Sequence, residues 1–116
     1  MALTLFGIPN CDTVKKARTW LEQNAIPYTF HDYKKQGIDA GHLQRWQKAA
    51  GTAVILNQRG TTWKKLPDED KSSLSEDRAI QLMQAHPSLI KRPVVEGGKA
   101  LLVGFNVAEW QHTLLP

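Results

Sequence analysis

The chain has 116 residues, of which 41% are hydrophobic, and its 15 basic and 11 acidic residues give a net charge of +4. This length suits one domain around a single core, so no separate second domain is expected. The basic residues are scattered in pairs, which argues against a nucleic-acid-binding protein. No segment reaches the roughly 20 apolar residues that cross a bilayer, and no signal-peptide pattern opens the chain. With one cysteine and therefore no disulfide framework, a cytoplasmic protein is expected.

The first third of the chain predicts a strand, a helix and a second strand. Residues 3–6 form a short β-prone run that Gly7 and Pro9 interrupt. One-face helical spacing predicts a helix over Asp12–Gln23, with the apolar positions Val14, Ala17 and Leu21. Tyr28–Asp32 alternates with period two and predicts a strand. Three elements in so short a space favour a parallel βαβ unit with a right-handed crossover.

Two helices with clear start signals are expected in the middle of the chain. Asp39 is placed as the N-cap of the first, whose apolar face would hold Leu43, Trp46 and Ala50. Ser75 is placed as the cap of the second, with acidic residues in its first turn and an end at His86-Pro87.

Three middle segments are less regular. Residues 52–57 fit a short helix or a strand, and periodicity does not decide between them. Residues 58–63 are interpreted as a loop that carries Arg59 and Trp63, and the acidic run 68–70 as a solvated turn.

The last quarter of the chain returns to a sheet pattern. Pro93–Glu96, a Gly97-Gly98 turn and Lys99–Val103 predict a β-hairpin. Asn106 with Glu109 predicts the start of a final helix, with Val107, Trp110 and Leu114 facing inward. The expected fold is therefore α/β, with βαβ followed by ββα in a mixed central sheet. One domain would span residues 1–116, its sheet core over about 1–33 and 88–116 and a helical insertion over about 34–87.

Cys11 is the only cysteine, and it falls where the first strand gives way to the first helix. A helix N-terminus beside cations lowers a cysteine pKa from about 8.5 into the range of about 3.5–7.5. Lys15 and Lys16 would supply cations, and Asp12 would partly oppose them. A reactive thiol is therefore the hypothesis, and a small buried apolar residue is the alternative.

Lys91-Arg92-Pro93-Val94 is the other unusual segment. A proline at the first position of a strand is allowed because that residue need not donate to the ladder. The alternative is a cis peptide bond at Arg92-Pro93. The histidines, by contrast, are widely separated, so no metal site is expected; they are His31, His42, His86 and His112.

These motifs together resemble the arsenate reductase-like (ArsC/Spx) family of the thioredoxin superfamily, most nearly its YffB-like branch. The resemblance rests on Ile8–Cys11, Ile55–Gly60, His86–Val94 and Leu102–Phe105. It implies a thioredoxin-like fold, in which Cys11 faces a cis-proline at Pro93.

The chain also departs from the family pattern. Val14 stands where dithiol members carry a second cysteine, so an outside thiol, for which glutathione is the natural choice, must resolve any disulfide on Cys11. Arsenate reductases of the family use three arginines, and here Arg92 matches one of them. Arg59 lies in the loop that carries the second of these arginines, although Asn57 can hold the equivalent register. The third arginine has no counterpart, because residues 103–105 occupy its place. Each missing contact removes about 1.5–3 kcal/mol, so weak arsenate binding is expected.

The resemblance implies a glutathione-dependent thiol reductase with Cys11 as nucleophile. Lys15 would stabilise its thiolate, and the substrate or glutathione site would include Asn10, Arg59, Arg92 and Pro93. Glutathione is the expected co-substrate, with glutaredoxin left open as a partner; no metal, tightly bound cofactor, nucleic acid or membrane partner is expected. The alternatives are a strict arsenate reductase coupled to glutathione or glutaredoxin, and an Spx-like non-enzymatic regulator that binds a protein such as RNA polymerase.

Overall fold

The computed structural model describes residues 2–72 and 74–116, and the chain divides into two compact units. Unit 1 comprises Met1–Gln36 and Arg92–Pro116, and unit 2 comprises Gly37–Lys91. The expectation that both belong to one domain stays a prediction.

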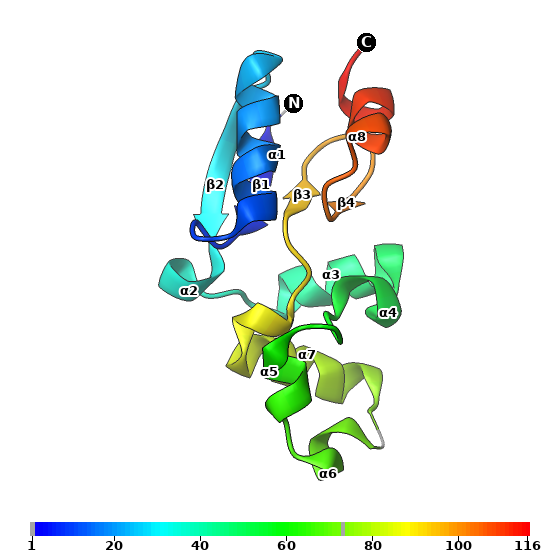
Figure 1. The fold of residues 1–116 in the computed structure, drawn as a ribbon. Coiled ribbons are helices and arrows are strands. Elements are labelled where there is room, and N and C mark those ends of the chain that lie inside the picture. Colours follow the sequence, from blue (N-terminus) through cyan, green and yellow to red (C-terminus); the bar gives the residue numbers. More distant parts are fainter. Residues whose placement is uncertain (1, 73) are drawn as a thin grey trace. The chain divides into compact units, whose positions relative to one another are not determined.

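Unit 1 holds a four-stranded sheet with the strand order β2-β1-β3-β4 (Figure 1). β1 runs parallel to β2 and antiparallel to β3, which is antiparallel to β4. The elements in chain order are β1 (Leu3–Gly7), α1 (Asp12–Gln23), β2 (Tyr28–Asp32), α2 (Tyr33–Gln36), β3 (Val94–Glu96), β4 (Leu102–Val103) and α8 (Val107–Leu114). This mixed sheet, built as βαβ and then ββα, confirms the expected thioredoxin-like fold class.

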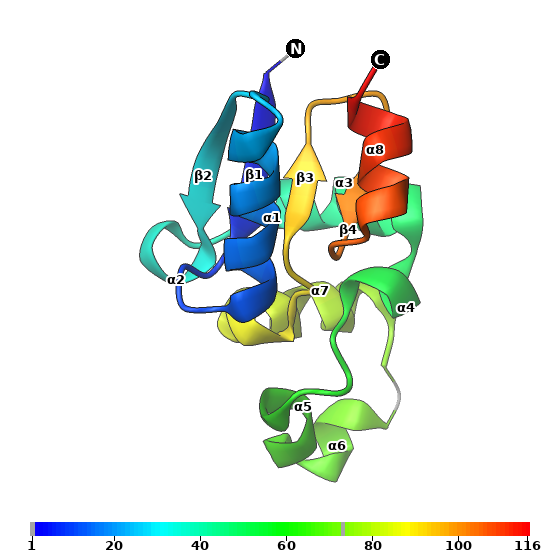
Figure 2. The same cartoon turned by 45° about the horizontal axis from the view of Figure 1, so that its top comes forward.

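The core of unit 1 lies between the sheet and two helices. Alternation along β1 turns Leu3 and Leu5 to one face, where they meet the apolar stripe of α1 and Trp110 of α8. Both helices therefore cover the same face of the sheet, as Figure 2 shows. Phe6 alternates to the opposite face and packs near His31 and Tyr33, with ring centroids 4.8 and 6.3 Å away.

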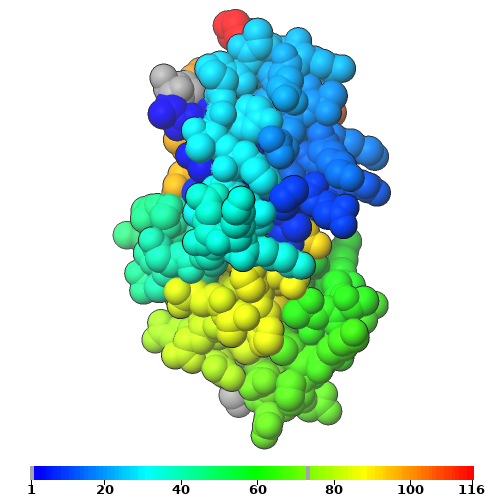
Figure 3. All heavy atoms as spheres, turned by 90° about the vertical axis from the view of Figure 1, so that its left-hand side faces the viewer, coloured from blue at the N-terminus to red at the C-terminus, as the bar shows by residue number. Residues whose placement is uncertain are grey.

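β2 forms one edge of this sheet and is only partly buried along its length. In Figure 3 the atoms of β2 and α2, in cyan, form a surface beside the blue atoms of the first helix and the loop before it. Within residues 2–72 and 74–116, the helices are all too short or too polar to traverse a bilayer.

Two expectations for the C-terminal part of unit 1 are wrong in detail. The hairpin's second strand covers only Leu102–Val103, because Lys99 and Ala100 are exposed in a longer connection. Gly97 has a φ of +105°, and a Cβ there would collide with the carbonyl oxygen of Ala2. Val107 is 44% exposed and not directed inward, because the first turn of α8 borders an open hollow. Trp110, by contrast, is fully buried as predicted.

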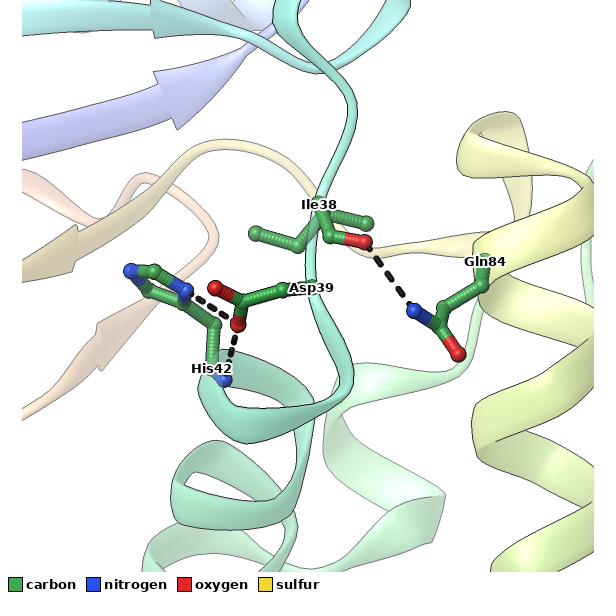
Figure 4. A network of polar contacts seen from close by, with 4 residues as sticks. All are labelled: Ile38, Asp39, His42 and Gln84. Atoms are coloured by element: carbon green, nitrogen blue, oxygen red, sulfur yellow. Dashed lines mark hydrogen bonds and ion pairs between the residues drawn. The ribbon is translucent and has the colours of Figure 1, made fainter.

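Unit 2 is helical. Its elements are α3 (Ala40–Ala50), α4 (Thr52–Ile55), α5 (Thr61–Lys65), α6 (Asp68–Lys71), α7 (Glu76–Ala85) and a 3-10 turn at Pro87–Leu89. Both predicted caps are confirmed: the Asp39 side chain accepts from the His42 N–H at 2.8 Å, and the Ser75 hydroxyl accepts from the Arg78 N–H at 3.1 Å. Figure 4 shows the Asp39 cap, together with the 3.3 Å hydrogen bond from the Gln84 amide to the Ile38 carbonyl.

The irregular segments of unit 2 differ from the expectations. Residues 52–57 combine both alternatives, since α4 is followed by an antiparallel bridge between Leu56 and Ile90. The loop prediction for 58–63 is wrong from Thr61 onward, where α5 begins. The acidic run 68–70 is not a simple turn but the start of α6, which places Asp70 within 2.8 Å of the Arg78 guanidinium. Single-turn helices of this kind depend on tertiary partners rather than on local pattern.

Candidate functional site

Cys11 is the N-cap residue of α1, with φ −134° and ψ 124°. Its carbonyl accepts the first helical hydrogen bond, from the Lys15 N–H at 2.9 Å. The side chain is half-buried, packed against the unit 1 core but still reached by solvent. The predicted position of Cys11 at a helix N-terminus is therefore confirmed, and the unpaired N–H groups of the first turn lie beside its sulfur.

Arg92 and Pro93 come to this place through the sheet. β3 pairs with β1 so that Val94 lies opposite Phe6, which sets the residues before β3 beside the loop that leads to Cys11. The Arg92-Pro93 peptide bond is cis, which confirms the second of the two alternatives for this segment. Pro93 is buried, and its carbonyl accepts a hydrogen bond from the Gly104 N–H at 2.8 Å. Two segments from opposite ends of the sequence thus meet at one thiol.

The surroundings of Cys11 favour its thiolate. Partial burial raises the pKa of the thiol, but four other contributions lower it: the Val14 N–H, a hydrogen bond from the Arg92 side chain, the Arg92 charge and the Thr13 N–H. Together they outweigh burial, so the pKa of Cys11 lies below its ordinary value. A partly exposed thiolate at a helix N-terminus is a nucleophile that can attack sulfur or another electrophile.

Tyr33 is a site residue that the sequence analysis missed. It is fully buried at the start of α2, and burial raises the pKa of its hydroxyl, while the charge of Arg92 acts in the opposite direction. The Arg92 guanidinium therefore lies within electrostatic reach of both the Cys11 sulfur and the Tyr33 hydroxyl. A signal was present: Tyr33 directly follows β2, and the carboxyl ends of the parallel strands β1 and β2 lie at one edge of the sheet.

The other three predicted site residues have exposed side chains. Asn10 is exposed in the turn before Cys11, and Lys15 is exposed on α1. Arg59 lies in unit 2, exposed, with its backbone N–H donating to the Asn57 side chain at 3.1 Å. The roles assigned to these three residues stay predictions. In the part of the chain that the structure describes, no cluster of His, Cys, Asp and Glu side chains is arranged to hold a metal ion.

Comparison with known proteins gives one family match and several similar proteins. The model of the ArsC family matches residues 6–113. The global transcriptional regulator Spx of Listeria innocua is 32% identical over 114 residues, which cover 97% of this chain and 86% of that protein.

Solved structures with high identity resemble the whole chain. The YFFB protein is 50% identical with a TM-score of 0.93, and the match covers 97% of this chain and 98% of that one. An arsenate reductase (ArsC) related protein from Brucella melitensis is 47% identical with a TM-score of 0.76, and the match covers 100% of this chain and 97% of that one. The sequence motifs and the fold therefore point to the same group of proteins.

Proposed function

Because the chain belongs to the ArsC family, we propose that it is a glutathione-dependent thiol reductase in which Cys11 is the nucleophile. One observation carries the proposal: the chain's single cysteine caps a helix, and Arg92 and the backbone N–H groups of the first turn lower its pKa. Because the chain has no second cysteine, a disulfide formed on this activated thiol must be resolved by a thiol from outside, such as glutathione.

In the first step, the Cys11 thiolate attacks the glutathione sulfur of a mixed disulfide between glutathione and a substrate thiol. The new bond joins Cys11 to glutathione, and the old disulfide bond breaks. The substrate sulfur leaves with the electron pair and takes a proton from water. The product is the reduced substrate thiol, and Cys11 is left as a mixed disulfide with glutathione.

In the second step, the thiolate of another glutathione attacks the sulfur of the bound glutathione. Oxidised glutathione leaves, and Cys11 returns as a thiolate that the Val14 N–H and Arg92 stabilise again. Each cycle consumes one free glutathione, which joins the glutathione of the mixed disulfide as oxidised glutathione while the substrate thiol is released, so the cycle balances with one protein cysteine. A glutaredoxin can replace the second glutathione as the resolving thiol.

The side chains around Cys11 are assigned to binding. Arg92 has the charge and the donors to hold a carboxylate of glutathione while it stabilises the thiolate. Pro93, which follows Arg92, and Asn10, which precedes Cys11, are assigned to the same binding site, and Lys15 adds positive charge one turn into α1. Arg59 is assigned to a second anionic group of the substrate. The reaction consumes reduced glutathione, which fits the reducing conditions of the cytoplasm.

The test is reduction of the glutathione mixed disulfide of cysteamine or cysteine, followed through glutathione reductase and NADPH. Wild-type protein should turn over, and intact-mass analysis should detect one glutathione bonded to Cys11. Cys11→Ser should abolish both, while Thr29→Ser, at an exposed position of β2, should change neither. Turnover that persists in Cys11→Ser would contradict the proposal.

A strict arsenate reductase is the second candidate, which the Brucella melitensis relative supports by its name. The missing third arginine argues against tight arsenate binding. An arsenate-dependent, glutathione-coupled assay decides between the two: rates that saturate with arsenate and are lost in Arg92→Met would favour arsenate as the substrate.

A regulator without enzymatic activity is the third candidate, which the Spx relatives support. Such a protein would bind a partner such as RNA polymerase independently of the thiol. Stoichiometric retention of that partner by Cys11→Ala protein, together with no turnover of any disulfide by the wild type, would favour this alternative.

A further inference from the structure

Unit 1 carries an open hollow of about 390 Å³ whose apolar walls have no role in the proposed chemistry. It lies between α1 and the start of α8 and begins one helical turn after Cys11. Its walls are apolar, formed by Trp20, Phe105 and Val107, and its rim includes Lys15 and Lys16. We call this feature the α1–α8 groove.

The aromatic walls of the groove pack against the core of unit 1. The Trp20 ring meets the rings of Phe105 and Trp110 edge to face, at centroid distances of 6.4 and 5.9 Å. Trp110 is itself fully buried, and its indole N–H donates to the Gly104 carbonyl at 3.1 Å. Val107 is 44% exposed at the mouth. A preformed apolar recess binds a large apolar side chain with little ordering cost to the protein.

The rim of the groove is positively charged. Lys15 and Lys16 are both exposed, and among the residues that the structure describes neither forms an ion pair. Asp12 is the acidic residue near them in the first turn of α1. Two unpaired ammonium groups beside one carboxylate attract an acidic partner during its approach and favour one alignment of that partner once it is bound.

The distance to Cys11 indicates how large the occupant is. Trp20 lies nine positions after Cys11, which is about 13 Å along a helix. A tripeptide-sized ligand spans about 10 Å at full extension, so glutathione on Cys11 does not fill the groove. An extended polypeptide covers 13 Å in about four residues.

From this geometry we propose that the α1–α8 groove binds the polypeptide next to the cysteine that is being reduced. The proposal rests on the proposed function and names its substrate class: a protein with a glutathionylated cysteine, acidic residues adjacent to it, and a large apolar side chain about four residues away. The acidic residues lie against Lys15 and Lys16, and the apolar side chain enters between Trp20, Phe105 and Val107. Cys11 takes the glutathione, and the polypeptide leaves with its cysteine reduced.

The kinetic experiment compares glutathionylated peptides with the glutathione mixed disulfide of cysteine. The first peptide carries two glutamates beside the cysteine and a phenylalanine about four residues away. The second peptide has lysines in place of the glutamates, and the third has serine in place of phenylalanine. Wild-type protein should have a kcat/KM about tenfold higher for the first peptide than for either of the others.

Two groove variants have matched controls in unit 2. Val107→Glu should lower kcat/KM for the first peptide about tenfold and leave the small disulfide unchanged, and Lys16→Glu should lower the ratio of kcat/KM for the first peptide to kcat/KM for the small disulfide about tenfold. Val54→Glu, at a valine of 46% exposure on α4, and Lys48→Glu, at an exposed lysine on α3, should change neither substrate. Equal rates for all three peptides, or equal effects of Val107→Glu and Val54→Glu, would overturn the inference.

A binding measurement separates the groove from the chemistry. A version of the first peptide with serine in place of the modified cysteine should shift the NMR signals of the Trp20 indole N–H and of Val107, and Val107→Glu should abolish the shift of the Trp20 signal. Binding without turnover of any disulfide would refute the reductase proposal and keep the groove as a docking surface. Turnover of the small disulfide without these shifts would refute the groove. Shifts that depend on protein concentration without peptide would assign the groove to a second copy of the chain and also overturn the inference.

Discussion

The two units of the chain are stabilised in different ways. In unit 1, Leu5 of β1 pairs with Phe30 on one side and with Val95 on the other, so residues remote in sequence lie side by side. In unit 2, helices begin at local caps such as Asp39 and Ser75, and the bridge between Leu56 and Ile90 is isolated. The groups that activate the thiol come together through the sheet, so the chemistry proposed here depends on unit 1 and its register.

The largest expected effect is the loss of stability when a buried tryptophan is removed from either unit, and thiol reactivity should distinguish the two variants. Trp110→Ala and Trp46→Ala should each lower the free energy of unfolding by about 3–5 kcal/mol, because both side chains are almost fully buried. The Trp110 core also packs against Cys11, so only Trp110→Ala should alter thiol reactivity in the folded protein. Denaturant titration and thiol alkylation in native buffer measure the two effects. An equal change of thiol reactivity in Trp46→Ala would contradict the assignment of the chemistry to unit 1.

A charge removed beside the thiol should matter more than one removed from unit 2. Arg92→Met should raise the pKa of Cys11, because burial would then be opposed by the backbone N–H groups without the Arg92 hydrogen bond and charge. It should also lower kcat/KM for a glutathione mixed disulfide about 10- to 100-fold, the equivalent of one charged hydrogen bond. Titration of the thiolate by ultraviolet absorbance gives the pKa. Lys48→Met, on the exposed surface of α3, is the control and should leave both quantities unchanged.

The helix caps offer a comparison in which the units should behave alike. Asn106 accepts a hydrogen bond from the Glu109 N–H at 3.0 Å in unit 1, and Ser75 caps α7 in unit 2. Either residue changed to alanine should cost about 1 kcal/mol of stability, measured by denaturant unfolding. Asn106→Asp and Ser75→Thr should retain most of the stability. A loss above about 2 kcal/mol in only one unit would show a further role for that cap.

The smallest expected effect concerns acid stability in unit 2. The His42 backbone N–H and the His42 ring lower the pKa of Asp39, with a further contribution from Arg45. A pKa that is lower in the folded chain adds stability above the unfolded value of about 3.9, and this stability is lost as the pH falls through the folded value. Asp39→Asn keeps a cap acceptor but does not titrate, so its unfolding midpoint should change less with pH on the acid side. If the unfolding midpoint of Asp39→Asn changed with pH on the acid side as much as that of the wild type, this prediction would be contradicted.

The sequence predicted the long elements well and the short ones poorly. The bounds of α1 and β2 agree with the structure because apolar positions repeat along each of them. The single-turn helices α5 and α6 have no such repeat, and the second hairpin strand is only two residues long. Val107 has helical spacing with Trp110, but the spacing does not show that a groove lies beside it.

The candidate site was also predictable only in part. Cys11 was predictable because the loop, the helix start and the lone cysteine are adjacent in sequence. The segment with Arg92 and Pro93 was recognisable as unusual from its proline at the start of a strand, but only the family resemblance connected it to Cys11. Tyr33 was missed because a tyrosine after a strand most often packs in the core, and its nearness to Arg92 depends on the register of the folded sheet.

The activation of Cys11 is tested by the pH dependence of its alkylation by iodoacetamide in the native wild-type protein. The rate should reach half its maximum below about pH 8.5, the value of an ordinary cysteine, because Arg92 and the first turn of α1 stabilise the thiolate. A midpoint at or above that of the same cysteine in the unfolded chain would show that the fold does not activate this thiol.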